Sequence, residues 1–95
     1  MSRMATGMLK IVAGESEPGR TILRLEGQVI GPWVEELKIA SETALIHGAV
    51  VLDLGDVSFV ERRGVELLQA LGARGVDLGN CTSFVLEQLK AQRRP

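Results

Sequence analysis

The first third of the chain shows two stretches in which hydrophobic and polar positions fit β-strands. Residues 8–13 are mostly apolar, and in residues 21–26 Leu23 and Leu25 alternate with charged side chains. The segment 14–19 between them contains two glycines and Pro18, which are residue types that turns favour. The pattern therefore predicts a hairpin of two antiparallel strands joined by a loop at residues 14–19.

A helix is predicted to follow this hairpin. Gly31-Pro32 starts it, since proline is tolerated at the first helical position, and apolar residues then recur every three or four positions as far as Leu45. His47-Gly48 fits the end of the helix, where glycine adopts the left-handed backbone and histidine interacts with the last carbonyl groups. We assign His47 to this capping role, because the chain has no second histidine to share a catalytic site.

The second half of the chain reads as strand, helix, strand and helix. Residues 49–54 form a nearly unbroken apolar run, which predicts a central strand covered on both faces by helices. A loop at residues 55–63, a short helix from Gly64 that ends around residues 72–75, and a short strand at 76–78 follow. A last helix begins near Asn80 or Thr82, either of which would cap it.

The predicted order of elements is β-β-α-β-α-β-α. Helices that link parallel strands must return over the sheet, so the order predicts an α/β fold with a mixed sheet of about four strands and helices packed on it. Ninety-five residues and 45% hydrophobic content suit a single domain over residues 1–95, with a core at roughly 8–91.

Composition and charge argue against several classes of function. Eleven basic and twelve acidic residues give a net charge of −1, without the basic excess that nucleic-acid binding requires. The longest apolar stretch is too short to cross a membrane, and the N-terminal residues lack the apolar core of a secretory signal. Cys81 has no disulfide partner, so we expect a reducing cytoplasm.

The stretch from Leu52 to Gly64, LDLGDVSFVERRG, resembles the signature of STAS domains, which reads roughly D-L-S-x-V-x-F-I-D-S-S-G. The start of the motif, its hydrophobic positions and its terminal glycine match without a gap, and Glu61 takes the place of the aspartate. Residues 25–29, LEGQV, are similar to the L-x-G-x-L that precedes the first helix of the family. The resemblance implies the STAS fold over most of the chain.

One departure from the motif changes the expected function. In the family, the second serine accepts phosphate from a partner kinase, and here Arg63 occupies that position, preceded by Arg62. An arginine has no hydroxyl group, and its fixed positive charge cannot alternate between neutral and negative. Ser58 lies five residues upstream, at a variable position, and the acceptor role is not transferred to it. We therefore expect no phosphosite at the usual position.

The resemblance implies a bacterial module of signalling and transcription regulation that binds another protein, without enzymatic activity, metal or cofactor. The expected contact surface lies around residues 55–63 and the start of the next helix, with the arginines pointing outward to solvent or to an acidic partner. The predicted partner-binding residues are Asp56, Ser58, Phe59, Glu61, Arg62, Arg63 and Gly64.

Three hypotheses of function stay open. The first is an antagonist-like module that binds an anti-sigma-factor kinase, and the second is a small cytoplasmic subunit of a membrane-transporter ATPase. The third, an enzyme or small-ligand binder, would use the carboxylates of Asp53, Asp56 and Glu61, or Cys81 with a pKa lowered near a helix N-terminus. Loop capping and solvation explain the carboxylates better than catalysis does, a buried or incidental cysteine is the better interpretation of Cys81, and no metal-binding spacing, phosphate loop or nucleophile motif occurs.

Overall fold

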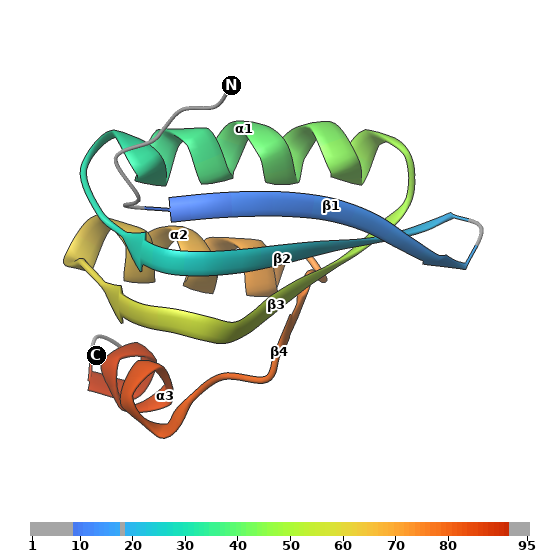
Figure 1. Cartoon of the computed structure of the whole chain (residues 1–95). Helices are drawn as coiled ribbons and strands as arrows, with labels where there is room; N and C mark the ends of the chain where they lie inside the picture. Colours follow the sequence, from blue (N-terminus) through green and yellow to red (C-terminus); the bar gives the residue numbers. More distant parts are fainter. Residues whose placement is uncertain (1–8, 18, 92–95) are drawn as a thin grey trace.

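A mixed β-sheet with helices packed on it forms the protein (Figure 1), and the computed structural model describes residues 9–17 and 19–91. The order of elements along the chain is the one predicted from the sequence. The elements are β1 (Leu9–Glu17), β2 (Arg20–Val29), α1 (Pro32–Ile46), β3 (Ala49–Val60), α2 (Arg62–Ala73), β4 (Asp77–Gly79) and α3 (Ser83–Ala91).

The strands lie in the order β1-β2-β3-β4. β1 pairs with β2 antiparallel, as the hairpin prediction requires, whereas β2–β3 and β3–β4 are parallel. Parallel neighbours need crossover connections, and α1 and α2 supply them on the same face of the sheet (Figure 1). The predicted α/β class with a mixed four-stranded sheet is confirmed. None of the helices within residues 9–17 and 19–91 is long and apolar enough to cross a bilayer.

The core lies between the sheet and the helices. In β2, Leu23 and Leu25 are buried and Arg24 is exposed, as the alternation predicts. β3 alternates in the same way, since Leu52 is buried and Asp53 is half-buried. The prediction that helices cover this strand on both faces is therefore wrong, because α1 and α2 lie on one face only. The largest fully buried side chains are Leu25, Leu37, Leu52, Leu54, Leu68, Leu71, Val29, Val50, Val57, Val60, Val65 and Val85.

The hairpin loop is shorter than predicted. β1 continues to Glu17 and β2 begins at Arg20, so most of the expected loop 14–19 is strand. A shift of register between Glu15 and Glu17 marks an irregularity that lets the strand continue through this polar segment. Met8, which the sequence placed in the first strand, lies outside the described residues.

The two ends of α1 agree with the sequence. Pro32 is the first helical residue, and Gly31 before it has φ 55°, a backbone that favours glycine. His47 is the C-cap, and its N–H donates to the Ala44 carbonyl at 3.0 Å. Gly48 follows with φ 142°, and a Cβ there would collide with the carbonyl oxygen of Gly19. The assignment of His47 to the end of the helix is thus confirmed.

The segment between β3 and α2 differs from the prediction. The expected loop at residues 55–63 is strand as far as Val60, and α2 begins at Arg62 instead of Gly64. Two shifts of register against β2 allow β3 to continue past Gly55, so that the buried positions Leu54, Val57 and Val60 stand three residues apart. Strand alternation is lost there, which made the segment read as a loop. Only Glu61 joins β3 to α2.

Candidate functional site: the junction of β3 and α2

Glu61 joins the ends of two strands to the starts of two helices. Its N–H donates to the Val29 carbonyl at 3.0 Å, and its carboxylate Oε2 accepts from the Gly31 N–H at 2.7 Å. Glu61 is the N-cap of α2 and Gly31 is the N-cap of α1. A carboxylate is stabilised by the partial positive charge at helix N-termini. Glu61, predicted as a partner-binding residue, is thus half-buried and engaged within the protein.

Gly64 brings the first turn of α2 close to the sheet. It is buried, and a Cβ at this position would lie 2.7 Å from Val60 Cγ1, 2.9 Å from Val29 Cγ1 and 3.0 Å from the Val29 carbonyl oxygen. Any larger residue would push α2 away from the ends of β2 and β3. The terminal glycine of the motif therefore has a packing role here, and it positions the residues before it.

Arg62 and Arg63 are the first two residues of α2, and both are exposed, as expected from the sequence. Arg62 Nε lies 3.7 Å from Glu66 Oε2, one turn along the helix. Arg63 forms no ion pair with any residue in the described part of the chain. Exposed pairs of this kind contribute little to stability, so both guanidinium groups stay available to a partner.

Phe59 and Phe84 form an exposed aromatic pair beside this junction. Their ring centroids are 6.3 Å apart with an interplanar angle of 33°, and Phe59 is 38% exposed and Phe84 54%. Ser58 is exposed and its hydroxyl donates to the Gly27 carbonyl at 3.3 Å, while Asp56 is exposed. The sequence did not single out Phe84, because the contact joins residues far apart along the chain.

The side chain of Gln88 in α3 forms two hydrogen bonds with the backbone of Val60, the last residue of β3. Its Oε1 accepts from the Val60 N–H at 3.1 Å, and its Nε2 donates to the Val60 carbonyl at 2.7 Å. β4 pairs with β3 only as far as Asp53, so the Gln88 carboxamide supplies the bonds that a neighbouring strand would make at Val60. Gln69 of α2 adds a bond from Nε2 to the Leu89 carbonyl at 2.9 Å. No local pattern in the sequence indicated these contacts.

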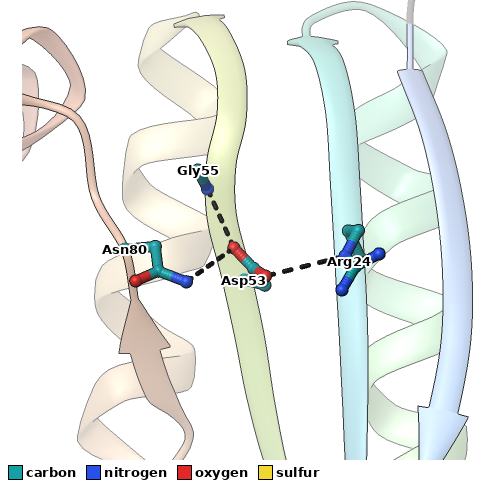
Figure 2. Close-up of polar contacts among 4 residues, drawn as sticks. All are labelled: Arg24, Asp53, Gly55 and Asn80. Atoms are coloured by element: carbon teal, nitrogen blue, oxygen red, sulfur yellow. Dashed lines mark hydrogen bonds and ion pairs between the residues drawn. The ribbon is translucent and has the colours of Figure 1, made fainter.

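Asp53, one of the carboxylates weighed for catalysis, is held by neighbours on the open face of the sheet (Figure 2). Its Oδ1 accepts from the Gly55 N–H at 3.0 Å and from Asn80 Nδ2 at 3.1 Å, and its Oδ2 lies 3.7 Å from Arg24 Nε. The bond from Gly55 lowers the pKa of Asp53 most, followed by that from Asn80, and Arg24 adds to the effect against burial. A carboxylate stabilised in its ionised form suits capping rather than proton transfer.

Cys81 does not have the reactive character considered from the sequence. Burial raises the pKa of its thiol, which contradicts the lowered pKa expected near a helix N-terminus. Thr82 is the residue that caps α3, because its Oγ1 accepts from the Val85 N–H at 3.2 Å. Among the residues that the structure describes, no group of three or more His, Cys, Asp or Glu side chains is arranged to hold a metal ion.

The fold has clear counterparts among solved structures. An anti-sigma factor antagonist from Mycobacterium paratuberculosis matches with a TM-score of 0.71 and 18% identity, over 92% of this chain and 82% of that one. The anti-sigma factor antagonist SpoIIAA in its unphosphorylated form matches with a TM-score of 0.66 and 19% identity, over 85% and 82%. The murine anion transporter Slc26a9 matches with a TM-score of 0.62 and 16% identity, over 87% of this chain and 18% of that one.

No family model matches the sequence, and a search of curated proteins gave no match either. At these levels of identity the structural likeness establishes the fold. The protein has the fold of STAS domains and anti-sigma factor antagonists, as the motif between Leu52 and Gly64 indicated.

Proposed function

We propose that this protein is a non-enzymatic regulatory module that binds another protein through the junction of β3 and α2. Residues 1–95 act as one STAS-like domain in this proposal, in a reducing cytoplasm where Cys81 stays a free thiol. Of the residues predicted from the sequence, Asp56, Ser58, Phe59, Arg62 and Arg63 form the partner surface, to which the structure adds Phe84, whereas half-buried Glu61 and buried Gly64 support it from below.

The observation that carries the proposal is the placement of Arg62 and Arg63. Both are exposed on the first turn of α2, and Glu61 and Gly64 fix that turn to the sheet. Charged groups on a rigid frame form specific contacts with little loss of conformational entropy. Phe59 and Phe84 supply exposed aromatic area, the kind of surface that contributes strongly to protein interfaces.

The same placement supports a module without the usual phosphorylation switch. SpoIIAA has been solved in both unphosphorylated and phosphorylated forms. In the present chain the motif places Arg63 at the position of the acceptor serine, and a guanidinium group cannot take up phosphate there. Binding in this protein would then be constitutive, or controlled from elsewhere, with an anti-sigma-factor kinase as the first candidate partner.

A pull-down from the source cell extract tests this proposal. Wild type and the Arg62→Glu/Arg63→Glu double variant serve as bait, and Lys38→Glu/Lys90→Glu is a control with the same change of charge on exposed residues of α1 and α3. Partners identified by mass spectrometry are then purified and titrated by calorimetry. We expect a kinase-like partner that binds wild type and the control, and that loses at least about tenfold in affinity with the double variant.

Other results would change the proposal. A partner that binds the double variant as tightly as wild type would exclude the arginines from the contact. Recovery of a transporter ATPase would favour the second hypothesis, for which the likeness to part of an anion transporter is the supporting observation. Failure to retain any protein, together with thermal stabilisation by a metabolite, would favour a ligand-binding role.

A further inference from the structure

A second surface lies on the opposite edge of the sheet from β4, along β1. A groove of about 550 Å³ runs between β1 and α1. Ile11 and Ala13 of β1 contribute to its floor, and Ile39, Ala40 and Thr43 of α1 form much of its wall. The lining is therefore mainly aliphatic, and Ile39 is 52% exposed.

The groove lies beside an unpaired strand edge. β1 is the first strand of the sheet, and within residues 9–17 and 19–91 no other strand pairs with its outer side. Its residues 10 and 12–14 are exposed. A strand edge of this kind presents backbone N–H and C=O groups that an incoming extended chain can pair with. Backbone donors and apolar pockets for side chains thus occur together at one edge.

The charge of the groove indicates which charge a bound segment should carry. Glu36 is its only acidic lining residue, is exposed, and forms no ion pair with another described residue. His47, the C-cap of α1, lines the groove eleven positions after Glu36. At 1.5 Å per residue this is a length of about 16 Å, which an extended chain covers with about five residues. A basic side chain on the occupant would pair with Glu36.

We propose that the edge of β1 and the groove beside α1 bind an extended peptide segment of another protein, with apolar side chains at alternate positions and a basic residue facing Glu36. The segment adds a strand to β1 by backbone hydrogen bonds. Every second side chain enters the groove beside Ile11 and Ile39. This surface is separate from the β3–α2 junction, so a segment bound at β1 leaves the junction free for its own partner.

The probe for this proposal is the capped heptapeptide Lys-Thr-Val-Thr-Val-Thr-Lys, in which both lysines and both valines lie on one side of an extended chain. Having a lysine at each end lets either strand direction place one beside Glu36. Titration into the isotopically labelled full chain, followed by NMR, should shift the amide signals of β1 and of the groove face of α1. The same peptide with methylated backbone nitrogens loses the hydrogen bonds and should not bind.

Two variants of α1, one inside the groove and one outside it, test whether the peptide contacts the groove. Ile39→Ser removes an exposed groove side chain and should weaken peptide binding about tenfold. Ile46→Ser removes the even more exposed Ile46, at 79%, which does not line the groove, and should leave affinity unchanged. The Arg62→Glu/Arg63→Glu variant should bind the peptide normally.

Several outcomes would overturn the proposal. Absence of binding, shifts centred on other elements, or equal binding by the methylated peptide would each exclude strand addition at β1. Equal affinity in the Ile39→Ser variant would exclude the groove. Sedimentation as a dimer with protected β1 amides would assign this edge to a second copy of the chain instead.

Discussion

Gly64 is the residue at which the first turn of α2 contacts the ends of β2 and β3. The valine side chains of Val29 and Val60 occupy the space that a Cβ would need, and they belong to the core. Since cores are packed at close to crystalline density, even one added methyl group must displace them or tilt the helix. The geometry of Arg62 and Arg63 depends on this contact.

We expect Gly64→Ala to lower the free energy of unfolding by about 1–3 kcal/mol, because overpacking outweighs the better helix propensity of alanine. Gly72→Ala is the matched control in the same helix, where the nearest atom to the new Cβ, Leu78 Cδ1, is 3.9 Å away. The control should gain about 0.5–1 kcal/mol. Urea denaturation measures both, and equal effects of the two changes would contradict the packing role.

Asp53 should make stability depend on pH. Its pKa in the folded protein lies below the ordinary value of 3.8, so the ionised carboxylate stabilises the fold above that pH, and this stabilisation is lost as the pH falls through the folded pKa. We expect Asp53→Asn to be less stable than wild type at pH 7, with the difference closing below about pH 4. Urea midpoints at a series of pH values measure this.

The control for this measurement is Asp56→Asn, which removes an exposed carboxylate three residues further along β3. If the difference in stability between wild type and Asp53→Asn is the same at pH 3 as at pH 7, the contacts with Gly55, Asn80 and Arg24 do not stabilise the fold through the charge of the carboxylate.

At the scale of single residues, the sequence found part of the site. The motif located Arg62 and Arg63 correctly at a helix start, and their exposure follows from their charge. It did not reveal that Glu61 holds the Gly31 N–H, nor that Phe84 and Gln88 reach the junction. These contacts join residues about thirty positions apart in two cases, and no local period encodes such a distance.

At the scale of elements, few hydrogen bonds attach α3 to the sheet. Val85 is its fully buried side chain, and Gln88 is the residue that bonds both backbone groups of Val60. Elements with small buried area open locally at lower cost than the rest of a domain. We therefore expect the docking of α3 to depend on the two hydrogen bonds of Gln88.

We expect Gln88→Ala to leave the Val60 N–H and C=O without protein partners and to weaken the docking of α3. Hydrogen exchange of the Val60 amide and of the α3 amides should become about tenfold faster, which corresponds to the loss of one or two hydrogen bonds. Glu87→Ala, an exposed position on the same helix, is the control. Unchanged exchange in the Gln88 variant would mean that apolar contacts and the bond from Gln69 to the Leu89 carbonyl hold α3 without Gln88.

The end of β3 could not be predicted from the local sequence pattern. Its second half pairs with β2 through two shifts of register, and only this pairing keeps Gly55 and Asp56 within a strand. The alternation of buried and exposed positions fails there, so local pattern indicated a loop. The starts of α1 and α3 were predicted better, because Pro32 and Thr82 act within the first turn of the helix that follows.

At the scale of the whole molecule, one core joins the sheet to the helices. Buried side chains of β1, β2, β3, α1, α2 and α3 belong to a single cluster. Trp33, the only tryptophan in the chain, packs against that cluster from the first turn of α1. A shared core favours unfolding in one cooperative step.

We expect urea unfolding curves from Trp33 fluorescence and from far-ultraviolet circular dichroism to coincide. The fluorescence reports the environment of α1, whereas the dichroism reports all helices and strands. A two-state transition gives the same midpoint and slope for both signals. If the two curves have different midpoints, part of the molecule unfolds independently of the core around α1. The first element to test would then be α3.

The sequence by itself determined the order of elements, the alternating faces of β2, the ends of α1 and the absence of an acceptor hydroxyl at position 63. These features depend on local period, on capping and on the identity of one residue, all of which a linear sequence contains. Tertiary structure alone decided the length of β3, the role of Glu61, the attachment of α3 by Gln88 and the groove beside β1. Each of these arises where segments distant along the chain meet, and the physical reason is that a contact depends on two surfaces, while a local pattern describes only one.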